Sequence, residues 1–164
     1  MATDNLARGI RNNNPLNIRI SRNNWLGKVV NNTDGAFEQF TTQEYGLRAA
    51  FINIRTIVRR RAASKQATRV RELIHIWAPA ADNNNEHYYC KTIADKTGIQ
   101  PTDKVNLYDK NFMCLLVYGM AIVECGTLLN MARISNAYDM AYGKRDPLQL
   151  QVTQDAGANN QSQP

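Results

Sequence analysis

The most apolar stretch of the chain, KNFMCLLVYGMAIVECG, covers residues 110–126. Asp109 precedes this stretch as an N-cap, and Gly126 is placed to end a helix in the left-handed conformation. The stretch therefore predicts a strongly apolar helix. It is shorter than a membrane span, and no other stretch of the chain approaches that length.

Four further helices are predicted from apolar residues at helical spacing and from their capping residues. Their expected ranges are 41–61, 68–78, 86–97 and 135–142. Pro79 and Gly98 are placed to end the second and third of these helices. Before them, two short segments flank an Asp34-Gly35 step, which is typical of a β-hairpin. The expected fold class is therefore α+β, with a small β-hairpin lobe and about five helices.

The chain length and composition indicate one domain. With 164 residues, of which 43% are hydrophobic, the chain is long enough to bury a core and too apolar to be disordered. Residues 144–164 are polar and poor in core-forming side chains, so they are expected to form a flexible tail or a docking peptide. We therefore expect a folded domain over residues 1–143.

The net charge of +6 favours a polyanionic partner: nucleic acid, an anionic membrane surface or the bacterial cell wall. Basic residues recur along the predicted helix at 41–61, namely Arg48, Arg55 and Arg59 to Arg61. They form either a solvated face or a phosphate-binding surface. No nucleic-acid recognition motif accompanies them, so no specific nucleic-acid partner is expected.

Three cysteines at unpaired spacings argue against a disulfide framework and favour synthesis in a reducing cytoplasm. The sequence MATDNLARGIR has no apolar signal core, so export would need another route. Neither a zinc-binding spacing nor a phosphate-binding glycine loop is present. We expect no metal and no cofactor.

Two glutamates are candidate catalytic groups. Glu124 lies at the end of the apolar helix, where desolvation would raise its pKa and suit it to be the general acid of a glycosidase. The alternative is that its side chain simply reaches solvent at a frayed helix end. Glu38, on the second segment of the expected hairpin, is the candidate second carboxylate. Strand alternation places it opposite Phe37 and off the core face, where it would equally be an ordinary exposed residue.

Several motifs occur together in one order: RGIRNNNPLNIR, NNWLGKV, DGAFEQFTTQEYGLRA and IHIWAPAADNNNEHYYCKTIADKTGI. In this combination they resemble the phage virion-associated lytic proteins, a group that includes the lytic protein of enveloped double-stranded RNA phages. The resemblance covers about residues 8 to 126. The matching positions are Arg11 to Pro15, Trp25, Gly27, Phe37, Phe40, Gly46 to Ala49, Trp77 to Pro79, Asn83 and Tyr88.

This resemblance implies a lysozyme-like fold and degradation of peptidoglycan. Relatives often have His-Glu-Asn-Gly near the end of the apolar helix, and this chain has Val123-Glu124-Cys125-Gly126. A weaker resemblance links NNPLNIR, WLG and FEQF to bacterial cell-wall glucosaminidases, in which a glutamate-bearing helix comes first. A circular permutation of the fold, with Glu124 filling that place, is the hypothesis that reconciles the two orders.

The same resemblances suggest substrate-binding residues. Asn12, Asn13 and Asn14 would wall a glycan cleft, where amides bind sugar hydroxyls and acetamides. Trp25 or Trp77 would stack on a sugar ring, although Trp77 would equally serve as a core plug. DNNNEHYY looks like a cleft-lining stretch of lytic transglycosylases, which implies a binding role for Asn83 and Tyr88.

The sequence thus predicts a phage-encoded enzyme that cleaves glycosidic bonds of peptidoglycan, as a muramidase, glucosaminidase or lytic transglycosylase. It would reside in the virion or the host cytoplasm and act on the cell wall in the periplasm, at entry or at lysis. Other virion proteins are possible partners of the C-terminal tail. The alternatives are a cross-link endopeptidase and a non-catalytic virion protein.

Overall fold

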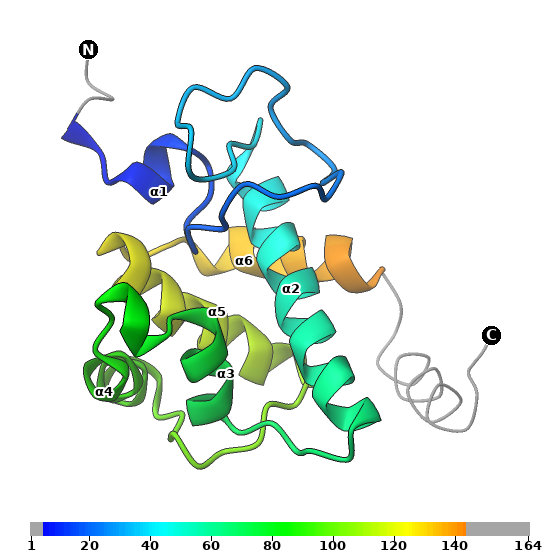
Figure 1. Cartoon of the computed structure of the whole chain (residues 1–164), viewed down its shortest axis with the longest axis vertical. Coiled ribbons are helices and arrows are strands. Elements are labelled where there is room, and N and C mark those ends of the chain that lie inside the picture. The colour runs from blue at the N-terminus through cyan, green and yellow to red at the C-terminus, as the bar shows by residue number, and fades with distance from the viewer. Residues whose placement is uncertain (1–4, 144–164) are drawn as a thin grey trace.

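A computed structural model describes residues 5–143 of the chain (Figure 1). The predicted tail, residues 144–164, and the first four residues lie outside this range. Within it the structure has six α-helices and one short 3₁₀ helix. They are α1 (Arg8–Arg11), α2 (Gln43–Ala63), α3 (Val70–Trp77), η2 (Ala80–Asp82), α4 (Glu86–Thr97), α5 (Lys110–Cys125) and α6 (Met131–Tyr142).

Helix α5 forms the centre of the fold. It contacts α1, α4 and α6, while α2 packs on α6 and α3 (Figure 1). Its fully buried residues include Met113, Leu116, Val117 and Met120. These four side chains share one face of the helix at the i, i+3, i+4 and i+7 spacing, and the buried Cys114 and Gly119 lie on either side of that face. Neighbouring elements therefore cover α5 on more than one side.

The predicted helix ends are largely confirmed. Asn85 and Asp109 cap α4 and α5 by accepting backbone N–H groups, and Gly98 and Gly126 end these helices with φ of 81° and 67°. Helix α2 begins after Thr42, one residue later than the expected cap. Helix α6 begins at Met131 instead of 135, because the Asn130 side chain accepts the N–H groups of its first turn.

The predicted α+β class is wrong, because the described residues contain isolated β-bridges and no β-sheet. Arg19 pairs with Phe37, and Lys28 with Phe40, but neither pairing extends into a strand. The segment between α1 and α2 instead forms an irregular lobe at the N-terminal end of α2 (Figure 1). We therefore replace the expected lysozyme-like fold with a hairpin lobe by a helical fold with an irregular lobe. The same correction applies to the circularly permuted form of the expected fold.

Side chains explain why no hairpin forms in this lobe. The Asn14 amide donates to the carbonyls of Ile18 and Glu38 at 2.9 Å each, and its Oδ1 accepts the N–H of Ile18. Asp34 Oδ1 accepts the N–H groups of Ala36 and Phe37. Asparagine and aspartate therefore satisfy backbone groups that a paired strand would otherwise satisfy.

Asp34 also joins the lobe to α1. Its carboxylate forms an ion pair with Arg8 at 2.6 Å and accepts a hydrogen bond from the Asn12 amide at 2.9 Å. The hydrogen bond from Arg8 holds the pKa of Asp34 well below its ordinary value, with further contributions from Asn12 and the loop N–H groups, while burial opposes them. The Asp34-Gly35 step thus anchors a loop and does not form a hairpin turn.

None of the helices among residues 5–143 combines the length and apolar character that a membrane crossing requires.

The first turn of α2 lies directly against the opening loop. A Cβ built on Gly46 would overlap the carbonyl oxygen of Asn13 and approach the Asn14 backbone. At Gly119 in α5, a Cβ would meet mainly the Thr97 and Ile93 side chains at 3.2 and 3.3 Å. Both glycines lie within helices, but only Gly46 has a backbone atom as its obstacle.

We expect Gly46→Ala to lower the free energy of unfolding by about 1–3 kcal/mol, because the loop backbone must move to admit a methyl group. Gly119→Ala is the matched control. Its side-chain neighbours can shift, and the gain in helix propensity offsets the crowding, so the change should stay within about 1 kcal/mol. Denaturant unfolding of both variants measures the difference; equal effects would contradict the close approach of loop and helix.

Candidate functional site

Glu124 lies in the last turn of α5, with its carboxylate held between two other segments of the chain. The Tyr89 hydroxyl on α4 donates to Glu124 Oε2 at 2.8 Å. The Asn17 amide of the opening loop donates to Oε1 at 3.3 Å and to the Glu124 carbonyl oxygen at 3.1 Å. The side chain is thus fixed by partners far from it in sequence, and the alternative of a frayed helix end does not describe it.

Burial raises the pKa of Glu124 above its ordinary value. The hydrogen bonds from Tyr89 and Asn17, together with Trp77, favour the ionised form but do not cancel this effect. Burial also raises the pKa of Tyr89, so its hydroxyl keeps its proton and donates. A carboxyl with these neighbours holds its proton to a higher pH than an exposed glutamate, as a general acid must.

Local structure explains how Asn17 and Tyr89 reach Glu124. Asn17 has a φ of 52°, a left-handed conformation that asparagine tolerates better than most residues. Tyr89 lies one helical turn before Ile93 on the buried face of α4. The absence of a side chain at Gly9 is also needed, since a Cβ there would lie 3.1 Å from Asn17 Oδ1 and 3.3 Å from Cys125 Cβ.

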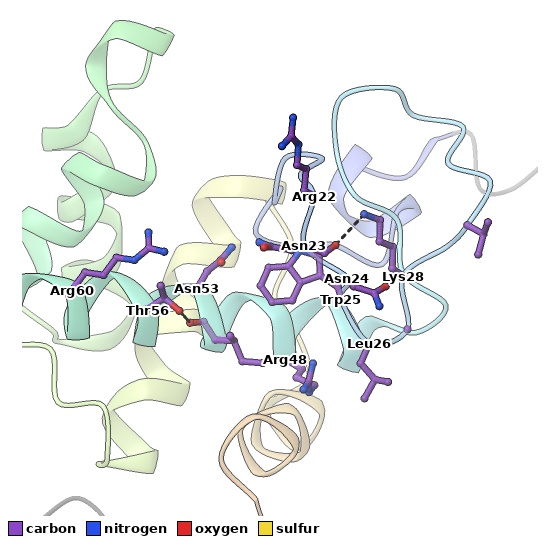
Figure 2. A pocket seen from close by; sticks show the side chains of 13 residues that line it. Arg22, Asn23, Asn24, Trp25, Leu26, Lys28, Arg48, Asn53, Thr56 and Arg60 are labelled. Carbon is purple, nitrogen blue, oxygen red and sulfur yellow. Dashed lines mark hydrogen bonds between the residues drawn. The ribbon is translucent and has the colours of Figure 1, made fainter. Parts of the chain in front are cut away.

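Glu124 lines a cavity of about 150 Å³, which we call the acid end. A second cavity of about 360 Å³ shares Asn17, Arg19 and Trp77 with the acid end. A third cavity of about 1130 Å³, the basic end, shares Asn23, Asn53, Thr56 and Arg60 with the second. The three cavities follow one another and form one groove between the lobe and helices α2 and α3. Figure 2 shows its basic end.

The walls of the groove are polar and aromatic. At the acid end the lining residues are Leu16, Asn17, Arg19, Phe37, Trp77, Ala78, Asp82, Asn84 and Glu124. Amides, an indole and carboxylates in a concave site are the groups that bind neutral polar ligands such as sugars. Asp82 is the second carboxylate in this set, and its side chain is exposed.

The structure places Asn12, Asn13 and Asn14 within the lobe, and they line none of the three cavities. Asn12 bonds Asp34 and accepts from Gln39 Nε2, and Asn13 donates to the Phe40 carbonyl oxygen. Asn12 and Asn14 are buried. Their amides are therefore occupied in holding the loop, and the asparagine of this segment that faces the groove is Asn17. The sequence offered one sign of this: Asn17 follows the triplet closely, in the same amide-rich segment.

Trp25 and Trp77 both lie in the groove wall. Each is half-buried against the hydrophobic core, Trp77 at the acid end and Trp25 at the basic end. Trp77 thus packs against the core and also lines the cavity. Their predicted stacking on a sugar ring stays a prediction.

Two of the predicted binding residues, Asn83 and Tyr88, lie away from Glu124 and its cavity, and in each case the next residue in sequence lies there instead. Tyr88 is 60% exposed, whereas Tyr89 is buried and bonds Glu124. Asn83 is exposed and lines none of the three cavities, whereas Asn84 lines the acid end. The helical register could have indicated Tyr89, because it lies four residues before the apolar Ile93.

Glu38 does not share a cavity with Glu124. Its side chain is fully buried, Oε2 contacts Lys28 Nζ at 3.1 Å and accepts the N–H of Ser21, and Oε1 has no hydrogen-bond partner among the described residues. The expected exposure of Glu38 is wrong, and Phe37 is the more exposed of the pair. Strand alternation failed here because the segment is an irregular loop. Residues 5–143 contain no group of three or more metal-ligating side chains.

Glu124→Gln should change the pH dependence of stability. Since the pKa of Glu124 is raised in the folded state, the folded protein binds the proton more tightly than the unfolded chain. The wild type therefore loses stability as the pH rises from about 4.3, the ordinary value for an unfolded glutamate, through the folded-state pKa.

Glu124→Gln lacks this loss, so its stability relative to the wild type should rise across that window. The Gln oxygen can still accept from Tyr89, and the loss of the acceptor for Asn17 is the same at every pH. Denaturant unfolding between pH 4 and 8 measures the difference. Glu44→Gln, which removes a carboxylate paired with Arg133 at 3.8 Å outside the groove, is the control and should show no such gain. A Glu124→Gln curve parallel to that of the wild type would contradict the raised pKa.

No protein-family model matches the sequence. Over 103 residues the chain is 37% identical to "Protein P5" of Pseudoalteromonas phage PM2. The match covers 61% of this chain and 61% of the relative, so the chain spans about three fifths of that protein's length. The resemblance to phage proteins is therefore supported by a phage relative, whose name describes neither an activity nor a substrate.

Proposed function

We propose that this protein cleaves glycosidic bonds of bacterial peptidoglycan, with Glu124 as the general acid. The observation that supports this most directly is a carboxyl of raised pKa, held by Tyr89 and Asn17, at one end of a polar and aromatic groove. A protonated Glu124 would donate to the oxygen between two amino sugars as the bond breaks.

The group that stabilises the sugar cation or activates water would be Asp82, Glu38 or a group of the substrate itself. Asp82 lines the same small cavity as Glu124 and is exposed, so it is the candidate to stabilise positive charge on the sugar or to activate water. A transglycosylase needs no second carboxylate, because a hydroxyl or acetamide of the substrate attacks instead. Glu38 is the weaker candidate, since its side chain is buried beside Lys28.

The biological setting is proposed from the phage relative and the charge. A phage-encoded protein with net charge +6 would adsorb to anionic wall polymers. It would be carried in the virion or made in the host cytoplasm, and would act on the wall in the periplasm, with other virion proteins as partners. Neither cross-link cleavage nor a non-catalytic virion role has a specific observation in its favour, and both are outcomes of the following test.

Glu124→Gln should lower glycan cleavage by about 10²–10⁴-fold, the usual contribution of a general acid. Mass analysis of digested cell wall measures it: new reducing or anhydro sugar ends report glycan cleavage, and new free amino groups report peptide cleavage. Glu44→Gln controls for the loss of one carboxylate, and Asp82→Asn separates a two-carboxylate mechanism from a one-acid mechanism. Undiminished sugar ends from Glu124→Gln would exclude Glu124, and amino groups alone would indicate an endopeptidase.

The pH profile of kcat/KM should fall on its alkaline side as Glu124 loses its proton. Tyr89→Phe removes a hydrogen bond that favours the ionised carboxylate, so the pKa of Glu124 should rise further and this fall should move to higher pH. Tyr88→Phe, a change of the same type on an exposed neighbour, should leave the position of the fall unchanged. A shift to lower pH in Tyr89→Phe would contradict the proposed proton donor.

A further inference from the structure

The basic end of the groove has four cations and no carboxylate in its lining. The cations are Arg22 and Lys28 from the lobe and Arg48 and Arg60 from α2 (Figure 2). Within residues 5–143, the guanidinium groups of the three arginines make neither an ion pair nor a hydrogen bond. Three uncompensated positive charges around one cavity favour an anionic ligand.

The other arginines of α2 show that this arrangement is not a general property of the helix. Arg55 donates to the Ala141 carbonyl oxygen at 2.9 Å, Arg59 donates to the Tyr108 hydroxyl, and Arg61 donates to Thr68 Oγ1 at 2.9 Å. These three arginines are attached to neighbouring elements. Arg48 and Arg60 both line the basic end, and their guanidinium groups have no such partner among the described residues.

Lys28 plays a different part from the arginines. Its ammonium group contacts the buried Glu38 carboxylate at 3.1 Å and donates to the carbonyl oxygens of Ser21 and Asn23 at 3.2 Å each. It therefore fixes the lobe that presents Arg22. Trp25 lies beside it in the wall, and its buried Nε1 has no hydrogen-bond partner among the described residues. A ligand with both acceptor and anionic groups would satisfy this indole and the arginines together.

We infer that the basic end binds the carboxylates of the stem peptide while the glycan strand lies toward Glu124. This inference rests on the proposed function. Peptidoglycan joins peptides with free carboxylates to a neutral sugar strand, and the groove joins a cation-lined cavity to an amide- and indole-lined one. Arginine binds carboxylates through paired N–H donors, and the Asn23, Asn24 and Asn53 amides of the same cavity suit a peptide backbone.

The arrangement favours a short branched anion over a nucleic-acid backbone. A phosphate backbone requires cations in a row along its path. Here the unpaired arginines surround a single cavity, while Arg55, Arg59 and Arg61 of the same helix are engaged elsewhere.

The test measures binding of glycan fragments to the Glu124→Gln protein, in which turnover is blocked. Two probes are compared by calorimetry: wall glycan fragments with their stem peptides, and the same fragments after an amidase has removed the peptides and the lactyl carboxylate that this exposes has been capped as a methylamide. We expect the peptide-bearing probe to bind about tenfold more tightly, as a few charge-assisted hydrogen bonds would produce. Raised salt should reduce this preference.

Arg22→Gln with Arg48→Gln, two residues that line only the basic end among the three cavities, should abolish the preference and leave binding of the stripped probe unchanged. The control combines Arg11→Gln with Arg71→Gln, which removes the same charge from exposed positions outside the groove and should keep the preference. Equal affinity for both probes would overturn the inference. Wild-type cleavage of the stripped glycan would then show that the proposed function stands without it.

Two other results would also overturn the inference. Loss of the preference in both double variants would indicate only a general charge effect. Failure to bind either probe, together with tight binding of a single-stranded oligonucleotide that depends on Arg22 and Arg48, would assign the basic end to nucleic acid. Absence of wall cleavage by the wild type, by contrast, would overturn the proposed function itself.

Discussion

The structure depends on the burial of one apolar helix that ends in an acid. The apolar surface of helix α5 is removed from water only when α1, α4 and α6 cover it. These contacts bring α4 and the opening loop to its C-terminal turn. Glu124 is then desolvated by the same packing that stabilises the core. Its partners Tyr89 and Asn17, the latter 107 positions away in sequence, keep the carboxyl oriented at an energetic cost that the hydrogen bonds only partly offset.

The irregular lobe is the second organising feature, and its amides replace a sheet. Asn12, Asn13 and Asn14 hold the loop by bonding backbone and side-chain groups, and Asp34 ties it to α1. A loop held in this way can place a residue in a left-handed conformation such as that of Asn17. The lobe thereby forms one wall of the groove from Glu124 to Trp25, which links a proposed catalytic end to a cation-lined end.

The groove combines chemical properties that each helix alone would not suggest. Helix α2 places two arginines on the groove side, while its other arginines bond neighbouring elements. Three arginines without an ion-pair partner among the described residues therefore line one cavity. Composition alone indicates only an anionic partner and does not locate it.

The sequence by itself predicted the five longer helices and several of their ends, because caps such as Asp109 and Gly126 act on neighbouring backbone groups. It missed the short helix α1 and the start of α6. It also singled out Glu124 as a candidate, because a carboxyl at the end of an apolar helix is desolvated unless its side chain reaches solvent. Tertiary structure alone decided that the hairpin signal at Asp34 anchors a loop, that Glu38 is buried, and that Asn17 and Tyr89 contact the acid. Those outcomes depend on contacts between distant segments, where side-chain amides compete with strand pairing and helix register selects one of two adjacent tyrosines.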